Sequence, residues 1–283
     1  MPEGRLVRID DTSLHVVTRG DGPIPLIVLH GGPGLDHHEF DDYLDPLGDR
    51  CTLHLVDMRH QGASARDTDP RTWTLERMAQ DVQMLALAMD LGPYAVLGHS
   101  YGSFVTLQHA IDHPGVPLAS IVSCGVPASS FMERQTELIA AMEPAEVREK
   151  VQAALAREAA VSTVEDLWDL LVDEMPVFFA DPLDPRIADY VARTARTILS
   201  PEVLAQAASA DFALDLTDRL AEIPHRVLVL GGRHDRVCPV EGSEATAAGI
   251  PGAELVIFER SGHMPFVEET EAYLDAVRAF LSR

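Results

Sequence analysis

The feature that most constrains the fold is a series of short, continuously apolar runs, each of which ends in a loop rich in glycine or polar residues. The first run, Pro25 to His30, ends in Gly31-Gly32-Pro33-Gly34. The others cover Thr52 to Asp57, Tyr94 to Gly98, Ala119 to Ser123, Arg226 to Leu230 and Ala253 to Phe258. Apolar runs without polar alternation indicate strands that are buried on both faces, as in a parallel sheet.

Helical patterns separate these runs. Leu75 to Leu91 has apolar residues at helical spacing, Phe104 to His109 continues as a helix that Pro114 terminates, and Tyr273 to Leu281 closes the chain as a helix. Strands that alternate with helices predict an α/β fold, with a mostly parallel central sheet and helices on both faces. The alternating segments 6–9 and 14–17 predict a hairpin of antiparallel strands at one edge.

The stretch from about 127 to 214 shows no strand pattern. It is typical of several helices broken at prolines, which are Pro144, Pro176, Pro182, Pro185 and Pro201. Because this stretch falls between two strands of the sheet, we expect a helical cap at 127–214. Residues 1–126 and 215–283 would then form one core domain, which suits a chain of 283 residues.

Composition excludes several classes of partner and location. The formal charge of −23 is spread along the whole chain and would repel nucleic acid and anionic membranes. No run of about eighteen or more apolar residues is present, and the N-terminal residues lack a secretory pattern. Cys51, Cys124 and Cys238 have no metal-ligand or redox spacing, which suits a reducing compartment. We therefore expect a cytoplasmic protein that acts on a small molecule or a short peptide, without membrane or nucleic acid.

Neither a cofactor nor a metal is expected from the motifs. The glycines from Gly31 to Gly34 lack the spacing of a dinucleotide or phosphate loop. The histidines lack the spacing of metal ligands as well.

The pentapeptide Gly98-His99-Ser100-Tyr101-Gly102 follows an apolar strand and opens a helix. In that context Gly-x-Ser-x-Gly indicates a nucleophile elbow, in which Ser100 is exposed on a sharp turn. The small residues Gly98 and Gly102 allow the strand and the helix to approach closely. The alternative is an ordinary strand-to-helix turn that happens to contain serine.

A serine nucleophile needs a base and an acid that orients the base. Asp235 and His263 each follow the end of a later strand, in the order Ser, Asp, His that this kind of fold uses. The alternative candidates for the base and the acid are less well placed in the sequence. His234 is adjacent to Asp235 and would point away from it, whereas His99 flanks the serine and is expected to pack near the elbow. Asp57 precedes the serine and is expected to hold the loop that contains Arg59.

The oxyanion of an acyl-transfer intermediate needs two backbone donors. One expected donor is the N–H of Tyr101, directly after the nucleophile. The other should come from the loop after the first apolar run, and we assign it to Gly32, with Gly31 as the alternative. Pro33 has no N–H.

These motifs resemble a known family. His30-Gly31-Gly32-Pro33-Gly34, Asp57-x-Arg59 with Gly62-x-Ser64, and Gly-x-Ser-Tyr-Gly at 98–102 look like the proline iminopeptidases of the α/β-hydrolase superfamily. The resemblance implies an α/β-hydrolase fold and cleavage of an N-terminal residue, often proline. It also implies cap or nearby glutamates that bind the free amine of the substrate.

Two positions depart from the family pattern. His60 stands where the family usually has glycine, and Arg236 follows the candidate acid where some members have glutamate. The positive charge of Arg236 disfavours an ammonium pocket there. The acids of the cap include Glu133, Glu137, Glu174 and Glu202, and none of them aligns with an amine anchor.

The function expected first is therefore a serine hydrolase of the proline iminopeptidase type, which acts through a Ser100–His263–Asp235 triad and an acyl-enzyme. The alternatives are an esterase, amidase or lactonase for small acyl groups, a cofactor-free lyase or oxidase, and a non-catalytic binding protein. The expected substrate pocket is apolar and includes Arg236, Trp168, Phe131, Phe178, Phe179 and Phe212. The alternative for the aromatic residues is that they pack the cap helices together.

Overall fold

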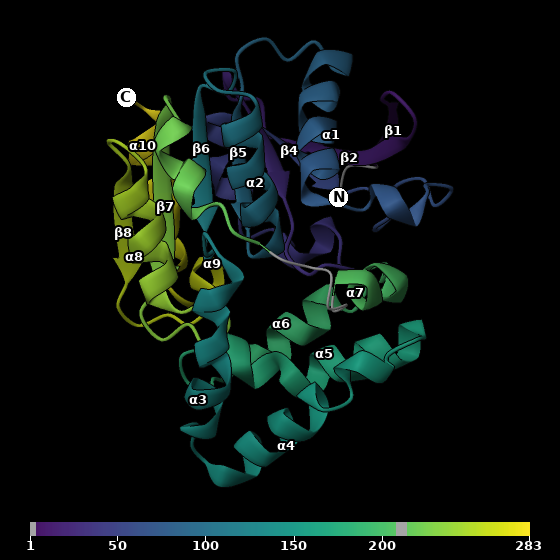
Figure 1. The fold of residues 1–283 in the computed structure, drawn as a ribbon, viewed down its shortest axis with the longest axis vertical. Helices are drawn as coiled ribbons and strands as arrows, with labels where there is room; N and C mark the ends of the chain where they lie inside the picture. The colour runs from purple at the N-terminus through teal and green to yellow at the C-terminus, as the bar shows by residue number, and fades with distance from the viewer. Residues whose placement is uncertain (1–3, 208–213) are drawn as a thin grey trace.

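The computed structural model describes residues 4–207 and 214–283, and an eight-stranded sheet lies at its centre (Figure 1). In spatial order the strands are β1 (Arg5–Arg8), β2 (Ser13–Arg19), β4 (Cys51–Asp57), β3 (Ile24–Leu29), β5 (Ala95–His99), β6 (Ala119–Ser123), β7 (Arg226–Gly232) and β8 (Glu254–Phe258). The strands from β4 to β8 in this order run parallel, and β1 and β2 form an antiparallel hairpin beside β4. The predicted α/β fold with an antiparallel edge is confirmed.

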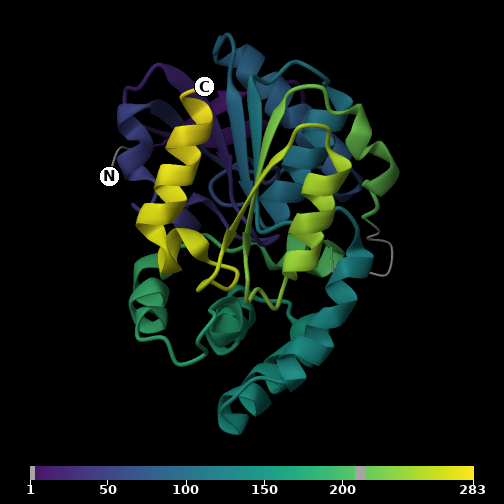
Figure 2. The ribbon, with the colours of Figure 1, turned by 90° about the vertical axis from the view of Figure 1, so that its left-hand side faces the viewer.

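Helices cover both faces of the sheet. Side chains of a strand alternate between the faces, so Val227 and Val229 of β7 join one core cluster and Leu228 and Leu230 join the other. The first cluster includes α1 (Leu75–Ala88) and α2 (Tyr101–Asp112), and the second includes α10 (Thr270–Leu281). Figure 2 shows α10 in yellow and α8 (Val240–Gly249) in yellow-green on opposite sides of β7 and β8. Burial on both faces explains the unbroken apolar runs of the sequence.

A group of α-helices in the described residues lies beyond the carboxyl ends of the parallel strands, in the lower part of Figure 1. They are α3 (Gln135–Ala140), α4 (Ala145–Leu155), α5 (Val164–Phe178), α6 (Arg186–Thr194) and α7 (Pro201–Ala207). We call residues 127–214 the cap, of which 208–213 lie outside the described residues. The two connections of the cap are hydrogen-bonded to each other, Ser129 N–H to the Leu214 carbonyl and Leu216 N–H to the Pro127 carbonyl, both at 2.8 Å.

Prolines begin most of the cap helices but do not break all of them. Pro144 and Pro185 are the N-cap residues of α4 and α6, and Pro201 is the first residue of α7. The expected break at Pro176 is wrong, because α5 continues through it to Phe178. Pro176 lies in the last turn of α5, where the lost N–H removes a single hydrogen bond and the flanking Met175 and Val177 are buried.

None of the helices in the described ranges combines the length and the apolar composition that a membrane span requires.

Candidate active site

Ser100 lies at the sharp turn between β5 and α2. Its φ of 51° and ψ of −118° are a conformation that residues other than glycine rarely adopt. The Ser100 N–H donates to the Ser123 carbonyl of the neighbouring strand at 2.9 Å, and the Ser103 N–H donates to the Ser100 carbonyl at 2.9 Å. Strain of this kind persists only where the surroundings hold it, and it gathers at functional sites.

The two glycines of the pentapeptide leave no space for a side chain. A Cβ on Gly98 would lie 2.0 Å from the Gly102 carbonyl oxygen, and a Cβ on Gly102 would lie 2.4 Å from the Leu29 carbonyl oxygen. The strand, the helix and the neighbouring β3 therefore meet at backbone distance. This close approach is what the spacing of the pentapeptide predicts for a nucleophile elbow.

Asp235 and His263 are brought together from two loops, after β7 and after β8. The Nδ1 of His263 lies 2.7 Å from Oδ2 of Asp235, and both side chains are buried. The N–H groups of Val237 and Cys238 each donate to Oδ1 of Asp235 at 2.8 Å, which fixes the carboxylate. The arrangement holds the imidazole with Nδ1 toward the acid.

The other ring nitrogen of His263 is available for chemistry. His263 and Ser100 line the same cavity. Within the described part of the chain, the buried Nε2 of His263 has no hydrogen-bond partner. An imidazole oriented by a carboxylate and unpartnered at Nε2 can take a proton from a serine hydroxyl.

The alternative candidates for the base and the acid, His234, His99 and Asp57, have different surroundings from His263 and Asp235. His234 is exposed, whereas His99 is fully buried with its ring centroid 4.9 Å from that of His263. Burial lowers the pKa of His99 well below its usual value, so this ring is neutral. Asp57 holds the loop after β4, since its carboxylate accepts the Ala63 N–H at 2.9 Å.

The glycine-rich loop after β3 is held by three side chains. His30 accepts the Met58 N–H at Nε2 (3.2 Å), so its Nδ1–H donates to the Gly31 carbonyl at 2.7 Å. Glu39 accepts the Gly31 N–H at 2.5 Å, and Gln61 accepts the Gly34 N–H at 2.7 Å. Of the two candidate oxyanion donors in this loop, Gly31 is therefore engaged, and the N–H of Gly32 has no hydrogen bond to any described residue.

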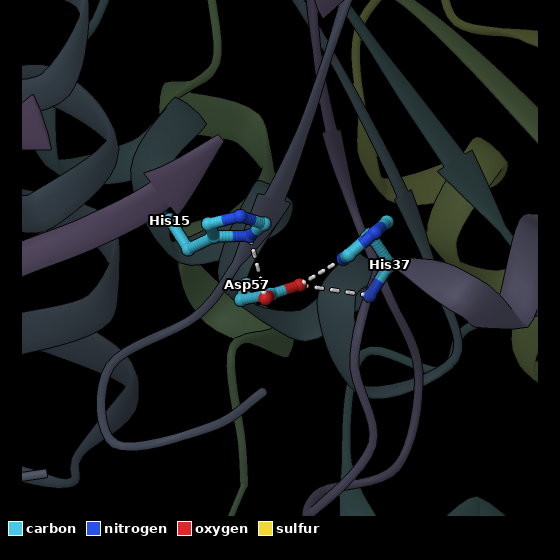
Figure 3. Close-up of side chains that lie close together, drawn as sticks. All are labelled: His15, His37 and Asp57. Atoms are coloured by element: carbon cyan, nitrogen blue, oxygen red, sulfur yellow. Dashed lines mark hydrogen bonds and ion pairs between the residues drawn. The ribbon is translucent and has the colours of Figure 1, made fainter. Parts of the chain in front are cut away.

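Asp57 joins the loop after β4 to the segment that follows the glycines (Figure 3). Its Oδ1 accepts from the backbone N–H (2.9 Å) and the Nδ1 (2.6 Å) of His37, and its Oδ2 accepts from Nδ1 of His15 at 3.0 Å. Burial opposes ionisation of this carboxyl, but the hydrogen bonds from the two histidines hold the pKa of Asp57 well below its usual value. Asp57 thus fixes the start of the short helix η1 (His37–Phe40), which carries Glu39.

A cavity of about 260 Å³ lies over Ser100 and His263. The residues that line it are mostly apolar and come largely from the cap: Leu155, Leu167, Leu170, Leu171, Met175, Val177, Phe178 and Leu204. The glycine-rich loop contributes Gly32 and Pro33. Its composition suits a small ligand with an apolar part.

The predicted pocket residues divide into three groups. Phe178 lines the cavity, and its ring centroid is 5.7 Å from that of His263. Trp168 lines a smaller adjoining cavity of about 40 Å³. Phe131 packs against the core cluster that includes α1 and α2, and Phe179 is fully buried. Phe212 lies outside the described residues.

Arg236 is not among the residues that line the cavity. Its guanidinium donates to the carbonyls of Phe179 (2.6 Å) and Ala180 (3.0 Å), just beyond the end of α5. The guanidinium is therefore engaged by the backbone beyond α5 and does not itself line the cavity.

The end of α5 is also tied to the histidine loop, once directly and once through Glu268. The His263 N–H donates to the Phe178 carbonyl at 2.7 Å, and Glu268 accepts from the N–H groups of Ala180 (2.8 Å) and Gly262 (2.7 Å). We call these bonds, with those of Arg236, the α5 clamp. The cap thereby helps to place the candidate base.

The acids of the cap separate by burial. Glu133, Glu137 and Glu202 are exposed, whereas Glu174 is buried and lines the cavity. Burial, together with the charge of the neighbouring Glu158, raises the pKa of Glu174 to about 8. Among the described residues, Oε1 of Glu174 has no hydrogen-bond partner. Glu158, from the short helix η5 (Glu158–Ala160), lines the same cavity, and burial raises its pKa.

Sequence reasoning missed Glu39 and Glu158. Both carboxyls line the cavity, but neither belongs to a motif. The one sequence feature that pointed to Glu39 is its position: it is an acidic residue directly before the apolar Phe40 and shortly after the glycine-rich loop.

Three groups of side chains in the described ranges place possible metal-ligand atoms within 4.8 Å of one another. They are His15–His37–Asp57, Asp36–His37–His38 and Cys124–Asp235–His263. In each group a histidine Nδ1 already makes a hydrogen bond to the carboxylate. Asp57 in addition accepts two backbone N–H groups, so these clusters are organised as hydrogen-bond networks rather than as open ligand sets.

The fold and the elbow at the carboxyl edge of the sheet define an α/β-hydrolase class of protein. The sequence profile of the family described as alpha/beta hydrolase fold matches residues 24–270, and the chain belongs to that family.

Individual relatives agree with the resemblance drawn from the motifs, which is confirmed. The chain is 25% identical to a proline iminopeptidase of Clostridium botulinum over 267 residues, which are 92% of this chain and 90% of the relative. A crystal structure of a proline iminopeptidase from Mycobacterium smegmatis superposes with a TM-score of 0.77 at 24% identity, covering 99% and 98% of the two chains. An enol-lactonase from Burkholderia xenovorans superposes equally well, with a TM-score of 0.77 at 20% identity over 99% and 100% of the two chains.

Proposed function

We propose that this chain is a serine hydrolase of the iminopeptidase type, which releases the N-terminal residue of a short peptide. The observation that carries the proposal is Glu174, a buried cap carboxyl in the same cavity as Ser100 and His263. The similarity to proline iminopeptidases at about a quarter of positions supports the same substrate class.

The proposed reaction begins with attack of Ser100 Oγ on the substrate carbonyl. His263 Nε2 takes the hydroxyl proton and returns it to the leaving amine, so the first step yields an acyl-enzyme and a free amine. Water then attacks the acyl-enzyme with the same histidine as base, and Ser100 recovers its proton. Asp235 keeps the imidazole in the required tautomer throughout, through the 2.7 Å bond to Nδ1.

The negative charge of each tetrahedral intermediate falls on the former carbonyl oxygen. We assign its stabilisation to the N–H groups of Tyr101 and Gly32, the first at the start of α2 and the second in the loop that lines the cavity. The positive end of the α2 dipole acts in the same direction.

Glu174 supplies the part of the site that selects the substrate. A buried carboxyl without a partner favours its neutral form, and its pKa of about 8 expresses that cost. A substrate ammonium placed beside Glu174 and Glu158 would compensate the free-energy cost of ionising these carboxyls. Each carboxylate would then have an opposite charge next to it, at a site shielded from water. The free amine of an N-terminal residue is such a group.

Hydrolysis of small esters or lactones is the second candidate. The observation that favours it is the apolar cap wall of the cavity, in which Leu155, Leu167 and Leu170 would contact an uncharged acyl chain. The same catalytic residues serve both reactions, so only the substrate distinguishes them.

The experiment compares proline p-nitroanilide, p-nitrophenyl esters of several acyl lengths and an acyl lactone with the wild-type protein. We expect cleavage of the proline anilide, and loss of turnover on every substrate in Ser100→Ala. Glu174→Gln should raise KM for the anilide at least about tenfold, since it removes a desolvated ion pair, and leave p-nitrophenyl acetate within about threefold.

Glu165→Gln is the matched control, because Glu165 lies on the same helix α5 and is exposed. An anilide left intact while esters are cleaved would move the assignment to the second candidate. Full activity of Ser100→Ala would refute the nucleophile itself.

A further inference from the structure

Glu39 is a buried carboxyl that takes no part in the steps above. It lies on η1, lines the cavity beside Ser100 and is 6% exposed. Burial raises its pKa to about 8, although the hydrogen bond from Gly31 works in the opposite direction. Burying a carboxyl costs free energy, so a buried carboxyl is expected where its contacts matter. Both carboxyl oxygens of Glu39 face the catalytic loops.

One oxygen holds the oxyanion loop. Oε2 of Glu39 accepts the Gly31 N–H at 2.5 Å. A Cβ on Gly31 would lie 2.6 Å from Oε1 of Glu39 and 3.1 Å from the Cβ of Ser100. Gly31 is therefore enclosed between the carboxyl and the nucleophile.

The other oxygen faces the nucleophile elbow. Oε1 of Glu39 is 3.7 Å from Nε2 of His99, and that nitrogen has no hydrogen-bond partner among the residues of 4–207 and 214–283. His99 in turn packs on His263, with ring centroids 4.9 Å apart. Glu39 thus contacts both walls of the reacting centre, the oxyanion loop and the residue before Ser100.

The segment that carries Glu39 is itself anchored. Asp57 binds His37 at the start of η1, and Asp36 caps the same helix by accepting the His38 N–H at 2.9 Å. The hydroxyl of Tyr190, from α6 of the cap, donates to the Glu39 carbonyl at 3.0 Å. These contacts hold the backbone of Glu39 from both the core and the cap.

We infer that Glu39 is a positioning residue: it fixes the His30–Gly31 peptide through the Gly31 N–H, and with it the place of Gly31, so that the next N–H, that of Gly32, is directed at the oxyanion. The inference rests on the acyl-transfer chemistry of the proposed function and not on its substrate. Because the oxyanion forms only during reaction, the loss of this contact should lower kcat and leave KM nearly unchanged.

The test compares Glu39→Met with Glu39→Gln. Methionine has a similar length but no acceptor oxygen, whereas the amide oxygen of glutamine can still accept the Gly31 N–H. On p-nitrophenyl acetate we expect kcat to fall about 100-fold in Glu39→Met, with KM within about threefold, and kcat of Glu39→Gln within about fivefold of wild type. The exposed Glu165→Met is the control for replacing an acid with methionine.

Two results would overturn the inference: a folded Glu39→Met enzyme with kcat within about threefold of wild type, or a Glu39→Gln enzyme as slow as Glu39→Met. An effect confined to KM would also overturn it, because Glu39 would then bind substrate. Hydrogen exchange in the wild-type protein needs no variant: we expect the Gly31 amide to exchange more slowly than the Gly32 amide, and equal rates would contradict the bond.

The choice of substrate keeps this test separate from that of the proposed function. p-Nitrophenyl acetate reports on the oxyanion hole whether or not the proline anilide is cleaved. The rate at which a fluorophosphonate labels Ser100 supplies the same comparison without any hydrolysed substrate, since that reaction also places negative charge on an oxygen beside the two N–H groups.

Discussion

At the scale of single residues, the described site depends on carboxyls whose surroundings differ. Asp235 accepts two backbone N–H groups and the Nδ1–H of His263, which hold its carboxylate in place. Glu174 and Glu39 are buried with fewer donors, and burial raises the pKa of each to about 8. A carboxylate held like that of Asp235 can orient a base. A carboxyl buried like those of Glu174 and Glu39 can bind a cationic ligand or accept a single N–H.

The raised pKa of Glu174 predicts a pH-dependent cost to stability. Between its ordinary pKa of 4.5 and about 8, the unfolded chain has lost this proton while the folded chain keeps it, so the free energy of unfolding falls as pH rises. Glutamine does not ionise. Glu174→Gln should therefore gain at least about 1 kcal/mol relative to wild type between pH 5 and pH 8, measured by urea unfolding.

The exposed Glu165→Gln serves as the reference for this comparison. An equal stability difference between wild type and Glu174→Gln at the two pH values would show that Glu174 ionises normally in the folded protein.

Sequence alone predicted the candidate residues whose roles are inferred from local pattern. Ser100, Asp235 and His263 lie at strand ends, so their position on one edge follows from the order of the strands. His60 is an example of what a sequence pattern can indicate about backbone conformation. It replaces a family glycine and adopts φ 60°, the left-handed conformation that glycine would favour. Its ring packs on Trp73 with centroids 4.2 Å apart, a contact that no sequence pattern indicated.

At the scale of elements, the cap is joined to the core at the α5 clamp. Sequence reasoning placed Arg236 in the substrate pocket, since adjacency to the candidate acid was the only information available. Its contacts instead come from Phe179 and Ala180, more than fifty residues earlier in the chain. Glu39 and Glu158 escaped notice for the same reason, because their burial arises from packing between segments distant in sequence.

Removal of the guanidinium should weaken the clamp in a measurable way. In Arg236→Ala two carbonyls lose charge-assisted hydrogen bonds, which we expect to cost about 2 kcal/mol in the free energy of unfolding. The end of α5 binds the His263 N–H, so kcat on p-nitrophenyl acetate should fall as well.

Arg233→Ala is the matched control, since Arg233 lies in the same loop, is exposed and pairs with the surface residue Glu259. It should change the free energy of unfolding by less than about 0.5 kcal/mol. If the two alanine variants were equally stable and equally active, the clamp would have no role in placing His263.

At the scale of the whole molecule, the dominant quantity is the net charge of −23. The chain has 45 acidic residues against 22 lysines and arginines, and the repulsion between the excess negative charges opposes the compact state. The ion pairs that offset it, such as Arg59 with Asp11 and Asp81, use most of the few cations available.

Salt should therefore stabilise the folded chain. At pH 8, raising NaCl from about 10 mM to about 300 mM shortens the screening length from about 30 Å to less than about 8 Å, and the midpoint of thermal unfolding should rise by several degrees. At pH 5, close to the sequence pI of 4.7, the same change should have a smaller effect. A midpoint that falls with salt at pH 8 would show that ion pairs outweigh the repulsion.

The α5 clamp has a consequence for how substrate and product exchange with the solvent. The same backbone that encloses the cavity also positions the imidazole, so a cap that swung open about α5 would disassemble the catalytic centre in every cycle. We therefore expect substrate and product to pass beside a stationary end of α5, through movements of side chains at the cavity wall, which are faster than the movement of a domain hinge. We expect product release in such an architecture to depend on how tightly the cavity holds the product, rather than on the opening of a lid.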